Sequence, residues 1–70
     1  MNYQPHELRV IKEQIDLDIK LLALDAFFLT GMFKENTPAR ERSLLLRQAD
    51  IMCVYSALLG ERINLFKCAA

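Results

Sequence analysis

The sequence is poor in the residues that interrupt helices and in those that bind metals. Its 70 residues include two glycines, two prolines, two cysteines, one histidine and no tryptophan. A single histidine with two distant cysteines fits no paired zinc-ligand spacing. Hydrophobic residues make up 53% of the chain, which excludes a disordered protein because such chains bury too little apolar surface.

The chain also lacks an excess of either charge. Nine basic and nine acidic residues give a formal net charge of zero. Non-specific nucleic-acid binding normally requires a basic excess, and mimicry of DNA requires an acidic one. The most apolar stretch, residues 21–33, is interrupted by Asp25 and is shorter than the ~20 residues of a membrane span. The first residues lack the layout of a signal peptide, so we expect a cytoplasmic protein.

Isolated reactive residues give no catalytic or metal-binding pattern. Cys53 and Cys68 are expected to be free thiols, since disulfides are rare in a reducing compartment. His6 has no recognisable nucleophile paired with it. Asp16 and Asp18 point to different sides of a helix and form no cation-binding loop. We therefore expect no enzyme activity, no metal and no cofactor.

Helical periodicity dominates what remains. The first predicted helix covers about residues 5–30, with Pro5 tolerated in its first turn and Glu7 favourable at its positive end. Gly31 is expected to end it in the left-handed conformation. Met32 and Phe33 are then able to fold back onto the helix end.

The second predicted helix covers about residues 38–67. Thr37 is expected to cap it and Pro38 to occupy its first position. Gly60, inside this helix, indicates a close helix contact or a bend. Because the connection is short, the sequence predicts an all-α fold: one domain over residues 1–70, an antiparallel two-helix hairpin that assembles into a homo-oligomeric helical bundle.

Two apolar stripes on opposite sides of the first helix support assembly. One stripe consists of Leu8, Ile11, Ile15, Ile19, Leu22, Ala26 and Leu29. The other consists of Val10, Leu17, Leu21, Leu24 and Phe28. A hairpin buries one stripe, and the other needs a further surface such as another copy. We assign the second stripe to the oligomer interface, while the spacing alone leaves open which of the two stripes packs within the chain.

The second helix carries polar side chains on a largely apolar face. That face contains Leu44, Leu45, Ile51, Met52, Leu58, Leu59, Ile63 and Phe66. Spread over the opposite side are Leu46, Ala49, Cys53, Val54, Ala57 and Leu65. Gln48, Tyr55 and Arg62 recur every seven residues within the main face. They either fix the register of an oligomer seam or form a row of ligand contacts in a crevice between chains.

Arginines gather at the start of the second helix. Arg40, Arg42 and Arg47, with the free N–H groups of the helix end, are suited to a phosphate, unless they form only a solvated charged turn. The candidate ligand-binding residues are Arg40, Arg42, Arg47, Gln48, Tyr55 and Arg62.

Residues 8–66 resemble a family of short helical proteins of phages and prophages, related to a small protein of crAss-like phages. The matching positions include residues 8–11, residues 17–21, Phe27, Phe33, Glu41, Leu44, Leu45, Gln48, Met52, Tyr55, Leu59, Arg62, Ile63 and Phe66. The resemblance implies a phage accessory protein. A looser architectural similarity connects it with phage helical hairpins that sequester cyclic nucleotide signals of bacterial immunity.

Two functions follow as hypotheses. The first is an oligomeric phage protein that counters host immunity by sequestering a cyclic nucleotide. The second is a protein-interaction module that docks an apolar helix face onto a host or phage protein without a ligand. The expected partners are copies of the chain and a nucleotide or a host protein, but neither a membrane nor a nucleic-acid polymer.

Overall fold

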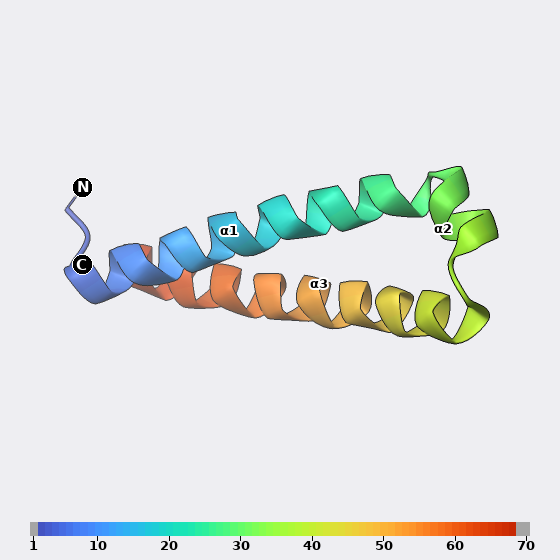
Figure 1. Cartoon of the computed structure of the whole chain (residues 1–70). Coiled ribbons are helices and arrows are strands. Elements are labelled where there is room, and N and C mark those ends of the chain that lie inside the picture. Colours follow the sequence, from blue (N-terminus) through green and yellow to red (C-terminus); the bar gives the residue numbers. More distant parts are fainter. Residues whose placement is uncertain (1, 69–70) are drawn as a thin grey trace.

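The computed structural model describes residues 2–68, and the side chains of residues 2–66. Three helices follow one another: α1 (Pro5–Phe28), α2 (Gly31–Asn36) and α3 (Ala39–Cys68). The long helices α1 and α3 run antiparallel side by side, and the short α2 lies at the turn between them (Figure 1). The molecule is a rod of 51 × 15 × 15 Å. The predicted all-helical hairpin is confirmed, with an extra helix at the turn.

The start of α1 is stabilised as its sequence predicts. Pro5 is the first helical residue, and the Gln4 N–H donates to Glu7 Oε1 at 2.7 Å. The carboxylate of Glu7 thereby reaches back to an N–H that the helix itself leaves unpaired. The helix ends at Phe28, slightly before the predicted end near residue 30.

The turn differs from the prediction. Gly31 does not adopt the left-handed conformation but begins α2, because the Thr30 hydroxyl accepts from the Phe33 N–H at 3.3 Å and caps that helix. Phe33 is buried and packs edge-on against Phe27 at 5.6 Å between ring centroids. It also lies 4.8 Å from Phe28, so the expected folding back of this segment is confirmed.

Thr37 and Pro38 lie between α2 and α3. The Thr37 hydroxyl donates to the Met32 carbonyl at 3.0 Å, so it closes α2 and was wrongly expected to cap the next helix. Pro38 precedes the first helical residue, Ala39, and its carbonyl accepts from the Arg42 N–H at 2.9 Å. The structure thus uses this dipeptide to separate two helices.

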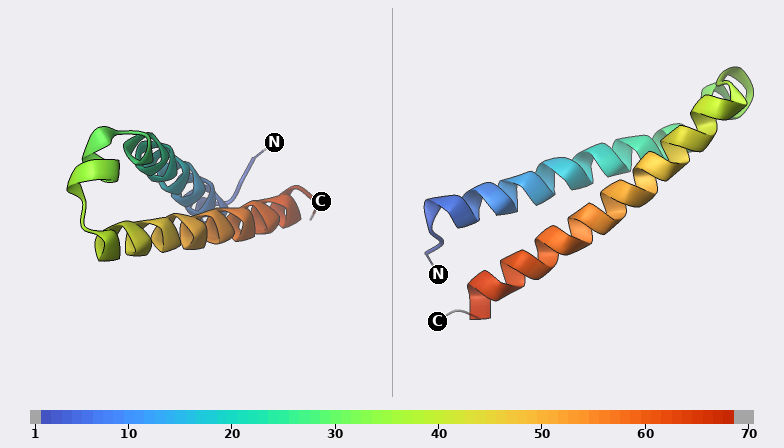
Figure 2. Two further views of the ribbon diagram at one scale, coloured as in Figure 1. Left: turned by 90° about the vertical axis from the view of Figure 1, so that its right-hand side faces the viewer. Right: turned by 90° about the horizontal axis from the view of Figure 1, so that it is seen from below.

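The hydrophobic core lies toward the end of the rod that is remote from α2. Val10 of α1 packs with Leu59 and Ile63 of α3, and Leu59 is fully buried. The helices cross obliquely, since they converge at this end in Figure 1 but at the other end in the right-hand view of Figure 2. Inclined packing of this kind lets side-chain ridges fill the grooves of the facing helix.

Polar contacts join the two helices beside this core. Gln14 Nε2 donates to the Ser56 carbonyl at 2.9 Å, and the Ser56 hydroxyl donates to Asp18 Oδ1 at 2.5 Å. A Cβ atom added to Gly60 would lie 3.1 Å from Gln14 Nε2. The glycine therefore makes room for the Gln14 amide, which selects the close-contact explanation over a bend.

The structure uses the two stripes of α1 in the opposite way to our assignment. The stripe assigned to the oligomer interface faces inward within the chain: Val10 and Leu21 are buried, and Leu17, Leu24 and Phe28 are half-buried. Its register places it against the face of α3 that contains Leu59. In the opposite stripe, Ile11 is half-buried and packs against the core. The large apolar residues of that stripe that are exposed form what we call the α1 outer stripe: Leu8, Ile15, Ile19, Leu22 and Leu29.

The apolar residues of α3 also divide differently. Ala49, expected on the far side, is buried. Several residues assigned to the main face are exposed instead. With Tyr55 and Leu65 they form what we call the α3 outer stripe: Leu44, Ile51, Tyr55, Leu58 and Leu65. Within residues 2–68, neither long helix combines the length and apolarity that crossing a bilayer requires.

Removing the fully buried leucine will destabilise the hairpin. Leu59→Ala is expected to lower the free energy of unfolding by about 2–3 kcal/mol, because it leaves a cavity in the core. Leu22→Ala, at a leucine that is 70% exposed, is expected to change it by less than about 0.5 kcal/mol. Chemical denaturation followed by circular dichroism measures both. Equal losses would contradict a core centred on Leu59.

Candidate functional site

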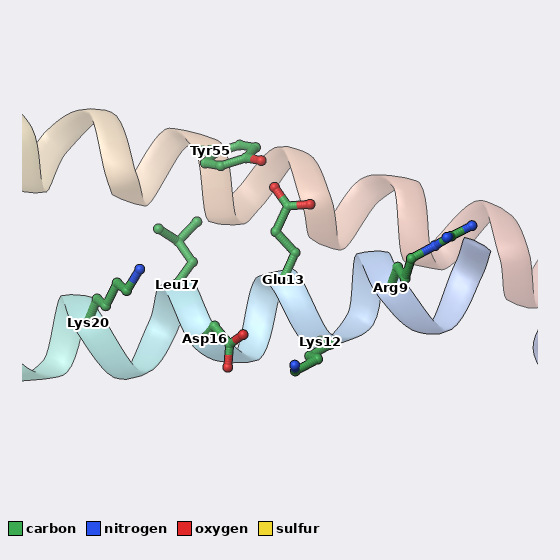
Figure 3. A pocket seen from close by; sticks show the side chains of 7 residues that line it. All are labelled: Arg9, Lys12, Glu13, Asp16, Leu17, Lys20 and Tyr55. Atoms are coloured by element: carbon green, nitrogen blue, oxygen red, sulfur yellow. The ribbon is translucent and has the colours of Figure 1, made fainter. Parts of the chain in front are cut away.

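A groove runs along one side of the hairpin between α1 and α3. Its volume is about 400 Å³, within the ordinary range of small-ligand sites. Six of its residues come from α1 and one from α3 (Figure 3). They are Arg9, Lys12, Glu13, Asp16, Leu17, Lys20 and Tyr55.

Helical spacing explains why these residues share one side. Arg9, Glu13, Asp16 and Lys20 follow one another at intervals of four, three and four residues, so they form one flank of α1. Leu17 lies next to this flank at the edge of the contact with α3. On α3, the ring of Tyr55 borders the same groove and is 41% exposed.

The side chains divide by direction. Glu13 and Leu17 point from α1 toward Tyr55, whereas Lys12 and Asp16 lie on the side of α1 away from it (Figure 3). The groove therefore combines an aromatic face, an aliphatic floor, two carboxylates and three cations. Such a set can stack a flat ring, accept hydrogen bonds from hydroxyl groups and attract an anion.

Only one of the six candidate ligand-binding residues lines this groove, namely Tyr55. Gln48 borders a neighbouring hollow of about 390 Å³, together with Lys20, Met52 and three further residues of α1. Arg47 and Gln48 line another hollow, of about 350 Å³, on the outer side of α3. Arg40 and Arg62 are exposed on α3. Gln48, Tyr55 and Arg62 thus lie outside the centre of the contact between α1 and α3.

Arg42 has a structural role in the chain. Its Nη1 atom donates to the Lys34 carbonyl at 2.9 Å and to the Thr37 carbonyl at 3.3 Å. These carbonyls belong to the end of α2 and the following residues, where helix geometry leaves acceptors unpaired. The predicted cluster of Arg40, Arg42 and Arg47 is therefore not a group of three free cations.

The cations that do line the groove were missed as ligand candidates. Arg9, Lys12 and Lys20 belong to a charged flank between the two apolar stripes of α1, and they are absent from the six predicted ligand contacts. The sequence did contain a signal for them, because this flank lies beside the stripe of Val10, Leu17 and Leu21 on the helix surface. When that stripe faces α3, the flank borders the groove. Because we assigned that stripe to the oligomer interface, these cations were not expected near α3.

Residues suited to other chemistry are dispersed. In the part of the chain that the structure describes, no three His, Cys, Asp or Glu side chains are placed to hold a metal ion. The His6 ring packs edge-on against Phe66, 6.3 Å between centroids. Cys53 is exposed on α3, and the side chain of Cys68 lies outside the described residues.

Comparison with protein families identifies a family model that matches most of this small helical protein. The family model named Sequestin matches residues 4–65, which include all of α1 and α2 and most of α3. The chain belongs to the Sequestin family, whose name suggests a sequestering or binding role. Neither the curated proteins nor the solved structures provide a match.

The structural role of Arg42 can be separated from the charge of its neighbour. Arg42→Ala is expected to lower the free energy of unfolding by about 1 kcal/mol, because two carbonyls lose a charged donor. Arg40→Ala removes an exposed cation from the same turn and is expected to stay within about 0.5 kcal/mol of the parent. Urea denaturation compares them. Equal stability of the two variants would show that the turn does not depend on Arg42.

Proposed function

We propose that this Sequestin-family protein is encoded by a phage, assembles from several copies in the host cytoplasm, and counters immunity by sequestering a cyclic nucleotide signal. The observation that carries this proposal is the groove that Tyr55 lines together with Arg9, Lys12 and Lys20. Family membership supports the sequestering role, and the groove supplies groups that suit a nucleotide.

Each part of a nucleotide has a suitable partner in the groove. The exposed ring of Tyr55 is a stacking surface for a base, and base–aromatic stacking contributes about 1–3 kcal/mol. Glu13 and Asp16 can accept hydrogen bonds from ribose hydroxyls or from the amino group of a base. The three cations attract phosphate through charge-assisted hydrogen bonds.

The two carboxylates make the groove selective. They repel a free phosphate or sulfate, which has no hydroxyl to donate in return. A nucleotide presents its sugar and base to the carboxylates while its phosphates contact Arg9, Lys12 or Lys20. This mixture of charges therefore favours nucleotides over simple anions.

A different observation favours the second function. The α1 outer stripe exposes five large apolar side chains on one helix face. Apolar residues at such helical spacing are typical of faces that dock into a groove of another protein. A host or phage protein that binds this stripe would make the chain an interaction module. A pull-down from infected cells that recovers the bait alone would count against that alternative.

Calorimetry with a panel of ligands tests the first function. Cyclic dinucleotides, cyclic trinucleotides and cyclic ADP-ribose isomers are titrated into the full chain, with inorganic phosphate as a control. We expect micromolar or tighter binding of at least one nucleotide and none of phosphate. The absence of binding to every nucleotide at micromolar concentrations would contradict the proposal.

Variants of the groove connect binding with the site. Tyr55→Leu retains an apolar side chain and removes the stacking surface, so it is expected to weaken binding about tenfold. Lys20→Ala is expected to weaken binding to a similar extent by removing a charged donor. Lys34→Ala, an exposed lysine of α2 outside the groove, is the matched control and is expected to bind normally. If Lys34→Ala lost binding while Tyr55→Leu and Lys20→Ala retained it, the ligand would bind outside the groove.

A further inference from the structure

The α3 outer stripe repeats every seven residues. Leu44, Ile51, Leu58 and Leu65 are spaced by seven, and Gln48, Tyr55 and Arg62 lie four residues after the first three of them. The alternating spacing of four and three residues is that of the contact positions of a coiled coil, called a and d. Ile51 is 66% exposed and Leu65 is 67% exposed, so the described side chains, residues 2–66, leave these positions of the seam uncovered.

Hollows on this seam have the form of coiled-coil holes. A coiled-coil hole is formed by four residues at positions i, i+3, i+4 and i+7, and it receives one side chain of the facing helix. One hollow of about 420 Å³ includes Ile51, Val54, Tyr55 and Leu58. The hollow of about 350 Å³ is lined by Leu44, Arg47, Gln48 and Ile51. Both sets have the required spacing and lie one heptad apart.

We propose that α3 of a second copy of this chain packs antiparallel on the α3 outer stripe, about a two-fold axis near Val54. In this arrangement Ile51 enters the hollow that contains Tyr55 of the other copy, and Leu58 enters the hollow that contains Gln48. Because the axis relates the two copies, every such contact is made twice. The contact depends on the surface of α3 alone and not on the proposed ligand.

The charges beside the seam fit this register. Arg47 and Glu61 lie seven residues before and after Val54, on the same edge of the seam. Antiparallel pairing about Val54 places Arg47 of each copy opposite Glu61 of the other, which gives two ion pairs. Within one helix these two residues are about 21 Å apart, at 1.5 Å per residue, and do not meet. The complementarity therefore exists only between copies.

Other pairings of these helices fit less well. In a parallel pair, Arg47 and Glu61 would face Met52 and Phe66, which already border α1, and would gain no opposite charge. The corresponding edge of the α1 outer stripe contains Asp18 and Asp25. Antiparallel pairing of α1 with itself places these aspartates against aspartates, which is unfavourable. Pairing α1 with α3 of a second copy matches Asp18 with Arg47 but leaves Glu61 unpaired.

Tyr55 connects the dimer contact with the groove. It lines both the groove that faces α1 and the hollow that faces outward. The α3 helix of the second copy therefore lies beside Tyr55 and provides an additional wall for a ligand in the groove. A site that is open in one chain becomes more enclosed in the pair.

Charge exchange tests the proposed register. Sedimentation or light scattering of the full chain over a range of micromolar concentrations is expected to show a mass twice that of one chain. Arg47→Glu and Glu61→Arg each replace two attractive pairs by two repulsive ones, and each is expected to weaken association about tenfold. The double variant R47E/E61R exchanges the charges and is expected to restore association. A parallel pair, or pairing of α1 with α3, predicts no such restoration.

Two equally exposed apolar residues provide a matched comparison. Ile51→Glu places a charge in the α3 outer stripe and is expected to abolish the dimer. Leu22→Glu places a charge in the α1 outer stripe, at a residue that is 70% exposed, and is expected to leave the dimer intact. Circular dichroism verifies that both variants remain helical. A monomeric parent protein, a dimer disrupted by Leu22→Glu alone, or charge reversals without effect would each overturn the proposal.

Discussion

Two helices can bury only one face each against one another, and the rest of this structure depends on that constraint. The contact of Val10 with Leu59 and Ile63 uses one face of α1 and one of α3. Every other large apolar residue on the long helices must border this contact or remain in water. The hairpin is consequently a thin rod with surplus apolar surface, and small folds of this kind usually need an additional source of stability.

The same constraint positions the candidate site. Once Leu17 and Leu21 face α3, the flank with Arg9, Glu13 and Lys20 necessarily lies along the edge of the contact. Tyr55 borders the same edge from α3. The groove therefore arises from helical register and needs no loop to shape it. Since its walls are two long helices packed on a shared core, the shape of the groove follows from the fold itself.

The fold was predictable from the sequence because periodicity and the short connection are local signals. The division of the stripes was not, since both stripes of α1 are similarly apolar and sequence spacing does not tell which one meets α3. That choice depends on the fit of particular side chains, such as the Gln14 amide beside Gly60. The role of Arg42 was equally hidden, because its acceptors are backbone carbonyls that any residue carries. Tyr55, one of the predicted ligand contacts, lines the groove, but its cationic neighbours follow only from the choice of stripe.

The position of Tyr55 has a thermodynamic consequence. One ring forms part of two surfaces, the groove toward α1 and the hollow on the outside of α3. A molecule that favours one orientation of this ring changes the free energy of occupying the other surface. Such coupling is reciprocal, so each occupant alters the affinity of the other by the same factor. A single aromatic side chain thus provides a short path for cooperativity in a protein of 70 residues.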